Sequence, residues 1–340
     1  MPAASKARAT KKKPFAIDFH SHINLEALHQ AVGAITLPEG TDPMIVKAFE
    51  RRKQHLRDFD SPVRNEHKAR IKAIDKLGFD LQQVSVNLGS AYYYADPQQA
   101  LEIARIANDG VADFVSKAPD RFMGMASVPV QDPKLAGEEL ERAVKQLGLK
   151  GAWILTHPGG RELGEPHFHP FWEKCIALDV PVVVHPDDFP GVERLEKFGM
   201  RNAIGRPLEE GVTMASMIYG GVMDAFPKLK ISICHGGGLL PYYIGRHEYN
   251  YDNNREYYKG LIKKRPTAYL KTFFYDTVVF DRDNLRTLFN KAGKEKIFLG
   301  SDFPHAVPDP VGFVHGSDLP KEAKEHILWR NAAKMLKLKI

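Results

Sequence analysis

Five side chains that could bind a metal ion or transfer a proton follow apolar runs in this sequence. The first two, His20 and His22, stand two residues apart at the end of the run 15–19. Because side chains alternate in direction along a strand, both imidazoles would point to the same side. Two neutral imidazoles that converge on one point suit a divalent metal ion. We therefore predict that this pair binds metal.

Three further candidates follow three other apolar runs. His185 ends the run VPVVVH, His235 follows KISIC, and Asp302 follows IFLGS. One histidine at a strand end is most often structural, but four strand ends that all carry such side chains indicate a common site. A second close pair, His167 and His169, lies between two prolines at the start of a predicted helix, and we interpret it as structural.

Apolar runs alternate with longer helical patterns from residue 15 onward. The predicted strands are 15–19, 81–87, 123–130, 151–156, 180–185, 230–234, 273–277 and 297–300. The predicted helices are 65–77, 98–117, 133–147, 170–177, 208–226, 240–259, 282–290 and 320–336. Several strands are apolar throughout, as parallel strands buried on both faces are. This order predicts an α/β fold, a (β/α)8 TIM barrel, whose strand ends meet at one mouth.

The main alternative is an open, doubly wound sheet. The sequence has no GxGxxG after the first strand, which disfavours the dinucleotide-binding form of that fold. Long connections follow the first and fifth strands, at 23–64 and 186–207, and in a barrel both would lie at the mouth. Without an internal repeat or a low-complexity linker, we predict one domain over 14–340 with a long insertion after strand 1.

Charge and cysteine content limit the other functional classes. The net charge is +6, but residues 1–13 contain five basic residues and no acid, so we interpret them as a flexible basic tail. We expect no nucleic-acid partner, because the folded part has no basic stripe. No apolar run approaches the 18 or more residues of a membrane span, and no signal peptide is evident. The two cysteines exclude a disulfide framework and favour the cytoplasm.

The ordered set of HxH, a lone histidine, HGGG and GSD resembles the amidohydrolase superfamily. The stretches IDFHSH, GVMDAFPKLKISICHGGGLLPYYIGR and ILWRNAAKML carry the resemblance, which extends from residue 15 to residue 336. More narrowly, the set is similar to the branch that contains aminocarboxymuconate semialdehyde decarboxylase. That branch also contains γ-resorcylate and other hydroxybenzoate decarboxylases, some hydratases and carbon–carbon hydrolases.

The resemblance implies one divalent metal ion per chain, with zinc in first place and manganese as the alternative. It implies four metal ligands: His20, His22, His185 and Asp302. Relatives with two metal ions use a carboxylated lysine at the end of strand 4. That strand here reads GAWILTHP and has no lysine at the mouth, so a single metal ion is expected. With zinc, three imidazoles and one carboxylate would give the site a charge of +1.

The resemblance also assigns roles to two residues outside the metal site. His235 matches the acid–base histidine of the family, and Arg246 matches an arginine that binds a substrate carboxylate, in some members across a dimer interface. We therefore expect a homodimer or a higher homo-oligomer. A second family arginine follows strand 1, where the candidates are Arg51, Arg52, Arg57 and Arg64.

Other polar residues near predicted strand ends rank below these. They are His157, Asp187, Asp188, Asp276 and His305. We interpret the glycines of HGGG as positions where the backbone approaches the site closely, and Cys234 as a packing residue that points away from His235.

The predicted function is a metal-dependent, nonoxidative decarboxylase that acts on an aromatic or ring-cleavage-derived (muconate-type) carboxylic acid. No organic cofactor is expected if the metal ion and a conjugated substrate stabilise the developing negative charge. The alternative is a metal-dependent carbon–carbon hydrolase or hydratase of an aromatic ring-cleavage product, with metal-bound water as the nucleophile. Trapped carbon dioxide would indicate the first function, and two organic fragments would indicate the hydrolase.

Overall fold

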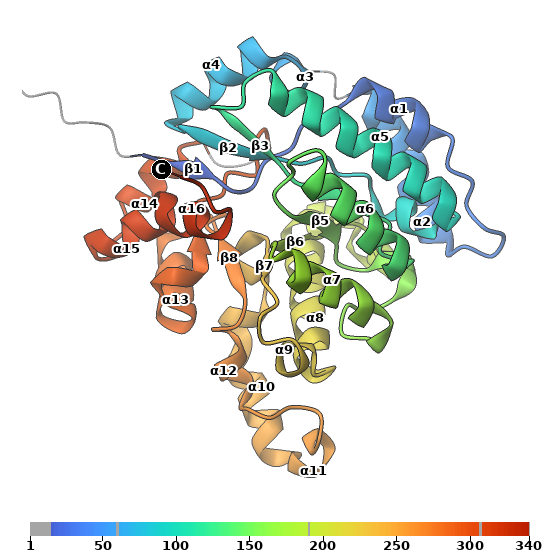
Figure 1. The fold of residues 1–340 in the computed structure, drawn as a ribbon. Coiled ribbons are helices and arrows are strands. Elements are labelled where there is room, and N and C mark those ends of the chain that lie inside the picture. Colours follow the sequence, from blue (N-terminus) through green and yellow to red (C-terminus); the bar gives the residue numbers. More distant parts are fainter. Residues whose placement is uncertain (1–14, 59–60, 190, 306–307, 340) are drawn as a thin grey trace, which may run out of the picture.

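The computed structural model describes residues 15–58, 61–189, 191–305 and 308–339, and the predicted basic tail lies outside these residues. Strands surround a centre, with most of the helices outside them (Figure 1). The strands are β1 (Ile17–Asp18), β2 (Leu81–Val84), β3 (Phe122–Gly124), β4 (Ala126–Ser127), β5 (Ala152–Leu155), β6 (Val182–His185), β7 (Ile231–Ile233), β8 (Phe274–Asp276) and β9 (Ile297–Phe298). The first helices are α1 (Glu26–Gly33), α2 (Pro43–Asp58), α3 (Pro62–Asn65), α4 (His67–Leu77), α5 (Pro97–Ser116), α6 (Pro133–Lys145), α7 (His169–Leu178) and α8 (Arg206–Tyr219). The remaining helices are α9 (Val222–Ala225), α10 (Leu240–Asn253), α11 (Arg255–Tyr258), α12 (Pro266–Tyr269), α13 (Arg282–Ala292), α14 (Pro310–His315), α15 (Lys321–Glu325) and α16 (Asn331–Met335).

All paired strands are parallel and follow the chain order, β1 to β3 in one sheet and β4 to β9 in another. β3 and β4 are two parts of one predicted strand, separated at Met125, whose N–H still donates to the Val84 carbonyl at 3.0 Å. The last strand returns to the first, because the Phe19 N–H donates to the Leu299 carbonyl at 2.8 Å. The described strands therefore form the closed, eight-stranded barrel that the sequence predicts.

Both faces of the barrel strands are buried. Trp153 and Val183 belong to a smaller core cluster that also contains residues of α16. Their neighbours Ile154 and Val184 belong to a larger cluster with the apolar faces of the surrounding helices. This alternation between two buried faces explains why these strands are apolar throughout rather than polar on every second residue.

The helices differ from the prediction mainly in the connection 23–64, which contains α1, α2 and α3. Their apolar residues form only a narrow stripe, such as Ile45, Ala48 and Phe49 on α2, and the rest of α2 is strongly polar. The predicted helix 208–226 is divided into α8 and α9 near Gly221, which has a φ of +75°. Among the described residues, no helix is long and apolar enough to cross a bilayer.

Candidate metal centre and substrate cavity

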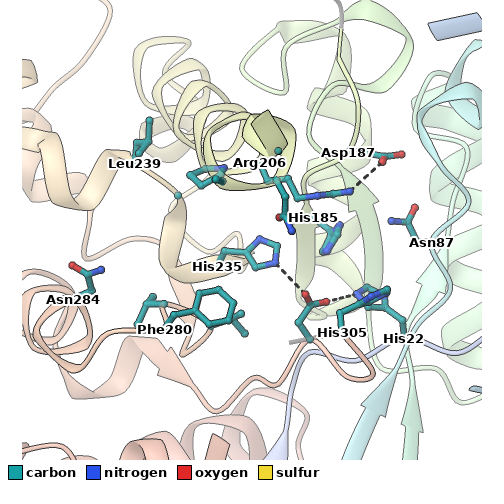
Figure 2. A pocket seen from close by; sticks show the side chains of 18 of the residues that line it. His22, Asn87, His185, Asp187, Arg206, His235, Leu239, Phe280, Asn284 and His305 are labelled. Atoms are coloured by element: carbon teal, nitrogen blue, oxygen red, sulfur yellow. Dashed lines mark hydrogen bonds and ion pairs between the residues drawn. The ribbon is translucent and has the colours of Figure 1, made fainter. Parts of the chain in front are cut away.

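A cavity of about 1080 Å³ lies where the strands end (Figure 2). His22 follows β1, His185 ends β6, His235 follows β7 and Asp302 follows β9, and all four side chains line this cavity. His235 and Asp302 have positive φ angles, 48° and 54°, which non-glycine residues seldom adopt and which often occur at functional sites. The barrel therefore brings four of the predicted residues to one cavity.

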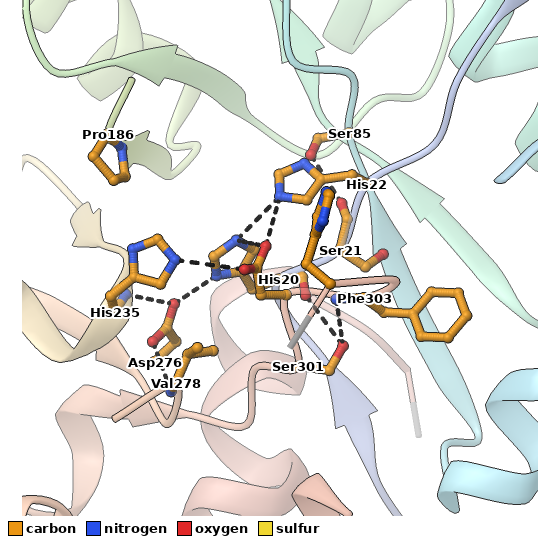
Figure 3. Close-up of polar contacts among 12 residues, drawn as sticks. His20, Ser21, His22, Ser85, Pro186, His235, Asp276, Val278, Ser301 and Phe303 are labelled. Carbon is orange, nitrogen blue, oxygen red and sulfur yellow. Dashed lines mark hydrogen bonds and ion pairs between the residues drawn. The ribbon is translucent and has the colours of Figure 1, made fainter. Parts of the chain in front are cut away.

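His20 completes the predicted metal site just beneath the cavity (Figure 3). Its Nε2 lies 3.3 Å from the Nε2 of His22 and 3.3 Å from Oδ1 of Asp302. The Nε2 of His22 lies 3.0 Å from the same Asp302 oxygen. Ligand atoms at roughly 2.1 Å from a tetrahedral zinc ion are about 3.4 Å from one another, so these three atoms are spaced as ligands of one ion would be.

A wider set of donor atoms surrounds the same point. Ligand atoms of His20, His185, His235 and Asp302 all lie within 4.8 Å of one another. His235 Nε2 is 3.8 Å from Oδ2 of Asp302. His235 thus lies nearly as close to the centre as the predicted ligands do. Its role is distinguished from theirs by the groups that its ring contacts, which are described below.

Asp276, at the end of β8, fixes the orientation of His20. Its Oδ2 accepts a hydrogen bond from His20 Nδ1 at 2.7 Å and another from the His235 backbone N–H at 3.0 Å. Because a carboxylate only accepts, Nδ1 must carry the proton, and His20 presents the lone pair of Nε2 to the metal position. The sequence placed Asp276 near a strand end but did not reveal this role.

A buried arginine that the sequence analysis missed supports the HxH segment. Arg70, on α4, donates to the His22 carbonyl at 2.8 Å, to Ser21 Oγ at 2.9 Å and to Gln82 Oε1 at 2.8 Å. Asp18 accepts from Gln82 Nε2 at 2.7 Å and from the Ser301 N–H at 3.0 Å, which links the first strand to its neighbours on both sides. Sequence periodicity gave no signal for Arg70, since a single arginine in a polar helix is usually exposed.

A buried glutamate holds His235 from behind. Glu210, on α8, has no exposed surface, and its Oε1 lies 2.7 Å from His235 Nδ1. This contact places the Nδ1 proton toward Glu210 and leaves Nε2 facing Asp302. Gly238 makes the contact possible, because a Cβ there would lie 2.3 Å from the Pro207 carbonyl and 2.7 Å from Glu210 Cβ. The sequence analysis expected the backbone of HGGG to approach the site closely, whereas at Gly238 the close approach is to α8.

The charges at the centre suit a cation. Burial lowers the pKa of His22 to about 3 and that of His185 well below its ordinary value, so both rings are neutral, as metal ligands must be. Burial would raise the pKa of Asp302, but hydrogen bonds from the surrounding histidines lower it well below its usual range. Burial also opposes protonation of His20, but Cys234, Asp276 and Asp302 together raise its pKa.

The donor set fits the divalent metal ion that the sequence implies. Three imidazoles and one ionised carboxylate are ligands that zinc and manganese both accept, and the raised pKa of His20 means that a bound ion would displace a proton from that ring. His185 Nδ1 is buried and has no hydrogen-bond partner among the described residues, as expected for a ring nitrogen positioned for an ion.

The cavity walls combine apolar and basic side chains. Ile23, Leu239, Val278, Val279 and Phe280 contribute apolar surface. Of the four arginines proposed after strand 1, Arg64 lines this cavity, and its guanidinium lies 3.0 Å from His305 Nε2.

Arg51, the other arginine of that group whose side chain the structure describes, does not line this cavity. Arg51 pairs with Asp188 at 3.5 Å and Glu196 at 2.8 Å. The side chains of Arg52 and Arg57 lie outside the described residues.

Several predicted residues lie outside the cavity. Arg246 is exposed on α10 and does not line the cavity of its own chain. His157 lies 3.6 Å from Glu162, away from the metal ligands. His167 and His169 do not line the cavity either. Cys234 is buried in the smaller core cluster, but its sulfur is also within 4.8 Å of ligand atoms of His20 and Asp276, so it packs directly beneath the site.

Comparison with known proteins identifies the family. The model of the amidohydrolase family matches residues 17–338. This chain belongs to the amidohydrolase family. It is 30% identical over 331 residues to 2-amino-3-carboxymuconate-6-semialdehyde decarboxylase of Dictyostelium discoideum, with 95% of this chain and 91% of that protein covered. The resemblance inferred from the sequence motifs is thereby confirmed.

Other relatives of this amidohydrolase are decarboxylases as well. It is 31% identical over 284 residues to a γ-resorcylate decarboxylase of Polaromonas sp., with 79% of this chain and 86% of that protein covered. A solved structure of 5-carboxyvanillate decarboxylase from Novosphingobium aromaticivorans matches with a TM-score of 0.83 and 26% identity, covering 96% of each chain. That structure contains manganese and 4-hydroxy-3-methoxy-5-nitrobenzoic acid. The named relatives are therefore decarboxylases of small organic acids.

Proposed function

We propose that this protein is a metal-dependent, nonoxidative decarboxylase of an aromatic or muconate-type carboxylic acid. The observation that carries the proposal is the cluster of His20, His185 and Asp302 with His235, which a buried glutamate orients, and with His22 beside His20 and Asp302. The activities named for its relatives agree with this reaction, and the cavity has apolar walls that suit a planar, conjugated substrate.

In the proposed reaction, the bond between the substrate carbon and its carboxylate breaks, and the electron pair stays on the carbon. His235 then supplies the replacing proton from Nε2, which faces the metal centre while Nδ1 is held by Glu210. The neutral ring regains a proton from water after carbon dioxide leaves. Arg64, on the cavity wall, is the arginine of the strand-1 insertion that we assign to a substrate carboxylate.

We assign the metal ion to His20, His22, His185 and Asp302. When bound, a divalent cation supplies positive charge that stabilises negative charge on substrate oxygens. We propose zinc as the resident ion, and manganese, which a structural neighbour contains, is the alternative. Metal analysis of protein purified without added metal distinguishes the two.

We further propose that the protein is a homodimer in which Arg246 reaches the cavity of the partner subunit. Leu239, which directly precedes α10, and Tyr243 on α10 are 45% and 63% exposed. Leu208 and Val212 of the adjacent α8 are also exposed, so the apolar surface continues across both helices. Burial of this surface between two copies would bring the exposed Arg246 close to a second chain. Light scattering should give a dimer or a higher homo-oligomer, and a monomer would contradict the assignment.

The state of the cysteines bears on the cellular location. Both cysteines, Cys175 and Cys234, are buried free thiols. We propose a cytoplasmic location on this basis, because a reducing compartment preserves such thiols. Fractionation of cells that produce the protein tests this proposal directly.

The decisive test is a screen of aromatic and muconate-type acids with the metal-loaded protein. We expect one equivalent of carbon dioxide per substrate consumed, together with a product that retains the rest of the carbon skeleton. His235→Asn is the matched control, because it keeps a polar side chain but cannot supply the proton. Two organic fragments in place of carbon dioxide would indicate a carbon–carbon hydrolase instead.

A further inference from the structure

A second basic side chain lines the cavity on the wall formed by α8. Arg206 is the first residue of α8 and follows the long connection after β6. Its side chain is about one-third exposed and lines the cavity (Figure 2). The sequence motifs of the family did not include this residue, and the roles assigned above do not use it.

The guanidinium of Arg206 is held from one side only. Nη1 donates to the Pro186 carbonyl at 2.6 Å, a short contact that fixes the group against the backbone. The nearest carboxylate among the described residues, Asp187 Oδ1, is 3.9 Å from Nη2, which is too far for a hydrogen bond. A guanidinium has five N–H donors, and contacts with the described residues engage one of them in a hydrogen bond. The remaining donors are available to a ligand.

Asp187 does not form a hydrogen bond with Arg206, because its carboxylate has another partner. Its Oδ2 accepts from the Ser90 N–H at 2.7 Å, which holds the carboxylate toward the segment after β2. Asp187 therefore partly balances the charge of Arg206 but leaves its hydrogen-bonding edge unoccupied.

Arg206 lines the same cavity as His185 and Asp302. The residue that holds its guanidinium, Pro186, directly follows His185 in the chain. The guanidinium therefore faces the space beside the metal position, where a substrate would lie.

We propose that Arg206 binds a second carboxylate of the substrate, one that is retained in the product, and so selects dicarboxylic over monocarboxylic acids. This inference rests on the proposed function and specifies its substrate class. A carboxylate accepts two parallel hydrogen bonds from a guanidinium, and the geometry of Arg206 leaves such a pair of donors available. A monocarboxylic acid would leave these donors without a carboxylate partner in the cavity.

The test compares two ligands that differ by one carboxyl group. They are 4-hydroxy-3-methoxy-5-nitrobenzoic acid and 2-methoxy-6-nitrophenol, in which the nitro group takes the place of the departing carboxylate. Calorimetry with manganese-loaded protein should show that the carboxylated ligand binds roughly tenfold to hundredfold more tightly. Arg206→Gln should abolish this preference, and Arg206→Lys should retain part of it. Arg201→Gln, in the same connection but outside this cavity, is the matched control and should preserve it.

Each outcome distinguishes the two proposals. Equal binding of both ligands by the wild type, or an unchanged preference in Arg206→Gln, would overturn the role of Arg206 while leaving the decarboxylase proposal intact. Loss of the preference in Arg246→Gln but not in Arg206→Gln would assign the carboxylate to Arg246 instead. If neither ligand bound in a metal-dependent way, the proposed function and this inference would both fail. Metal content of each variant confirms that the site is still formed.

Discussion

Replacement of Glu210 by glutamine should change the pH range in which the enzyme works. Glu210 is fully buried, and its contact with His235 is the main influence that raises the pKa of that ring to about 9 against the opposing effect of burial. The protonated ring is the proton donor, so activity is present below this pKa and is lost as the pH rises through it. Without the carboxylate, burial still lowers the pKa of His235 and Asp302 still raises it, so we expect a value near the ordinary 6.5. The alkaline limb of the pH–rate profile should then move to lower pH by about two and a half units.

The size of the effect at a given pH follows from the fraction of protonated ring. At pH 8 this fraction would fall from about 90% to about 3%, so turnover should decrease about 30-fold, whereas at pH 5.5 it should remain within a few-fold of wild type. A bound metal ion shifts the pH–rate profiles of the wild type and of Glu210→Gln in the same direction. The difference between these two profiles is therefore the quantity to measure.

The assay is the rate of carbon dioxide release at saturating substrate between pH 5.5 and pH 9.5. Glu209→Gln provides the matched control, because Glu209 is the neighbouring buried carboxyl group but receives its hydrogen bond from Thr156, away from His235. It should leave the alkaline limb unchanged. If Glu210→Gln gave the same profile as the wild type, or a loss that was equal at every pH, Glu210 would not control the proton on His235.

Three other predictions follow from the site. Purified protein should contain about one equivalent of divalent metal, and His185→Ala should lose most of it; full loading of the variant in metal analysis would contradict the ligand assignment. Arg246→Ala should raise KM, because a charge-assisted contact in a desolvated site contributes on the order of 2–5 kcal/mol, while metal content stays constant; an unchanged KM would remove its role. Burial raises the pKa of Glu209 from 4.5 to about 7, so its contribution to stability decreases as the pH rises through this interval. Glu209→Gln should therefore raise the free energy of unfolding at pH 8, by at most about 3 kcal/mol, with no gain at pH 4.5, as measured by urea denaturation.

The sequence predicted the barrel and the metal ligands for the same physical reason. His22, His185 and Asp302 each follow a strand that is buried on both faces, and such strands are visible as continuous apolar runs. Once the strands are arranged in a barrel, their ends must converge, so the site follows from the fold. The structure confirms the barrel. The metal-ligand assignment stays a prediction, which the short distances from His22 to His20 and to Asp302 support.

The residues that orient these ligands were not predictable in the same way. Glu210 and Arg70 lie on helices, where a charged residue is normally exposed, and only the three-dimensional packing shows that both are buried. The strand-1 insertion was predicted without its helices, because α2 buries a narrow apolar stripe and is otherwise polar. Of the two arginines in that region whose side chains the structure describes, position in the fold and not sequence spacing selects Arg64 over Arg51 as the one that lines the cavity.

The closure of the barrel has a consequence for how the protein matures. His22 and Asp302 are 280 positions apart in the chain, yet their side chains lie 3.0 Å from each other. A growing polypeptide would present the histidines of the first strand long before the last strand emerges from the ribosome. The loop that must close between them is among the longest in the chain, so this contact is expected to form late in folding. High-affinity metal capture would therefore be restricted to completed chains, and a protein shortened before residue 302 would bind the ion weakly even if its earlier strands had folded.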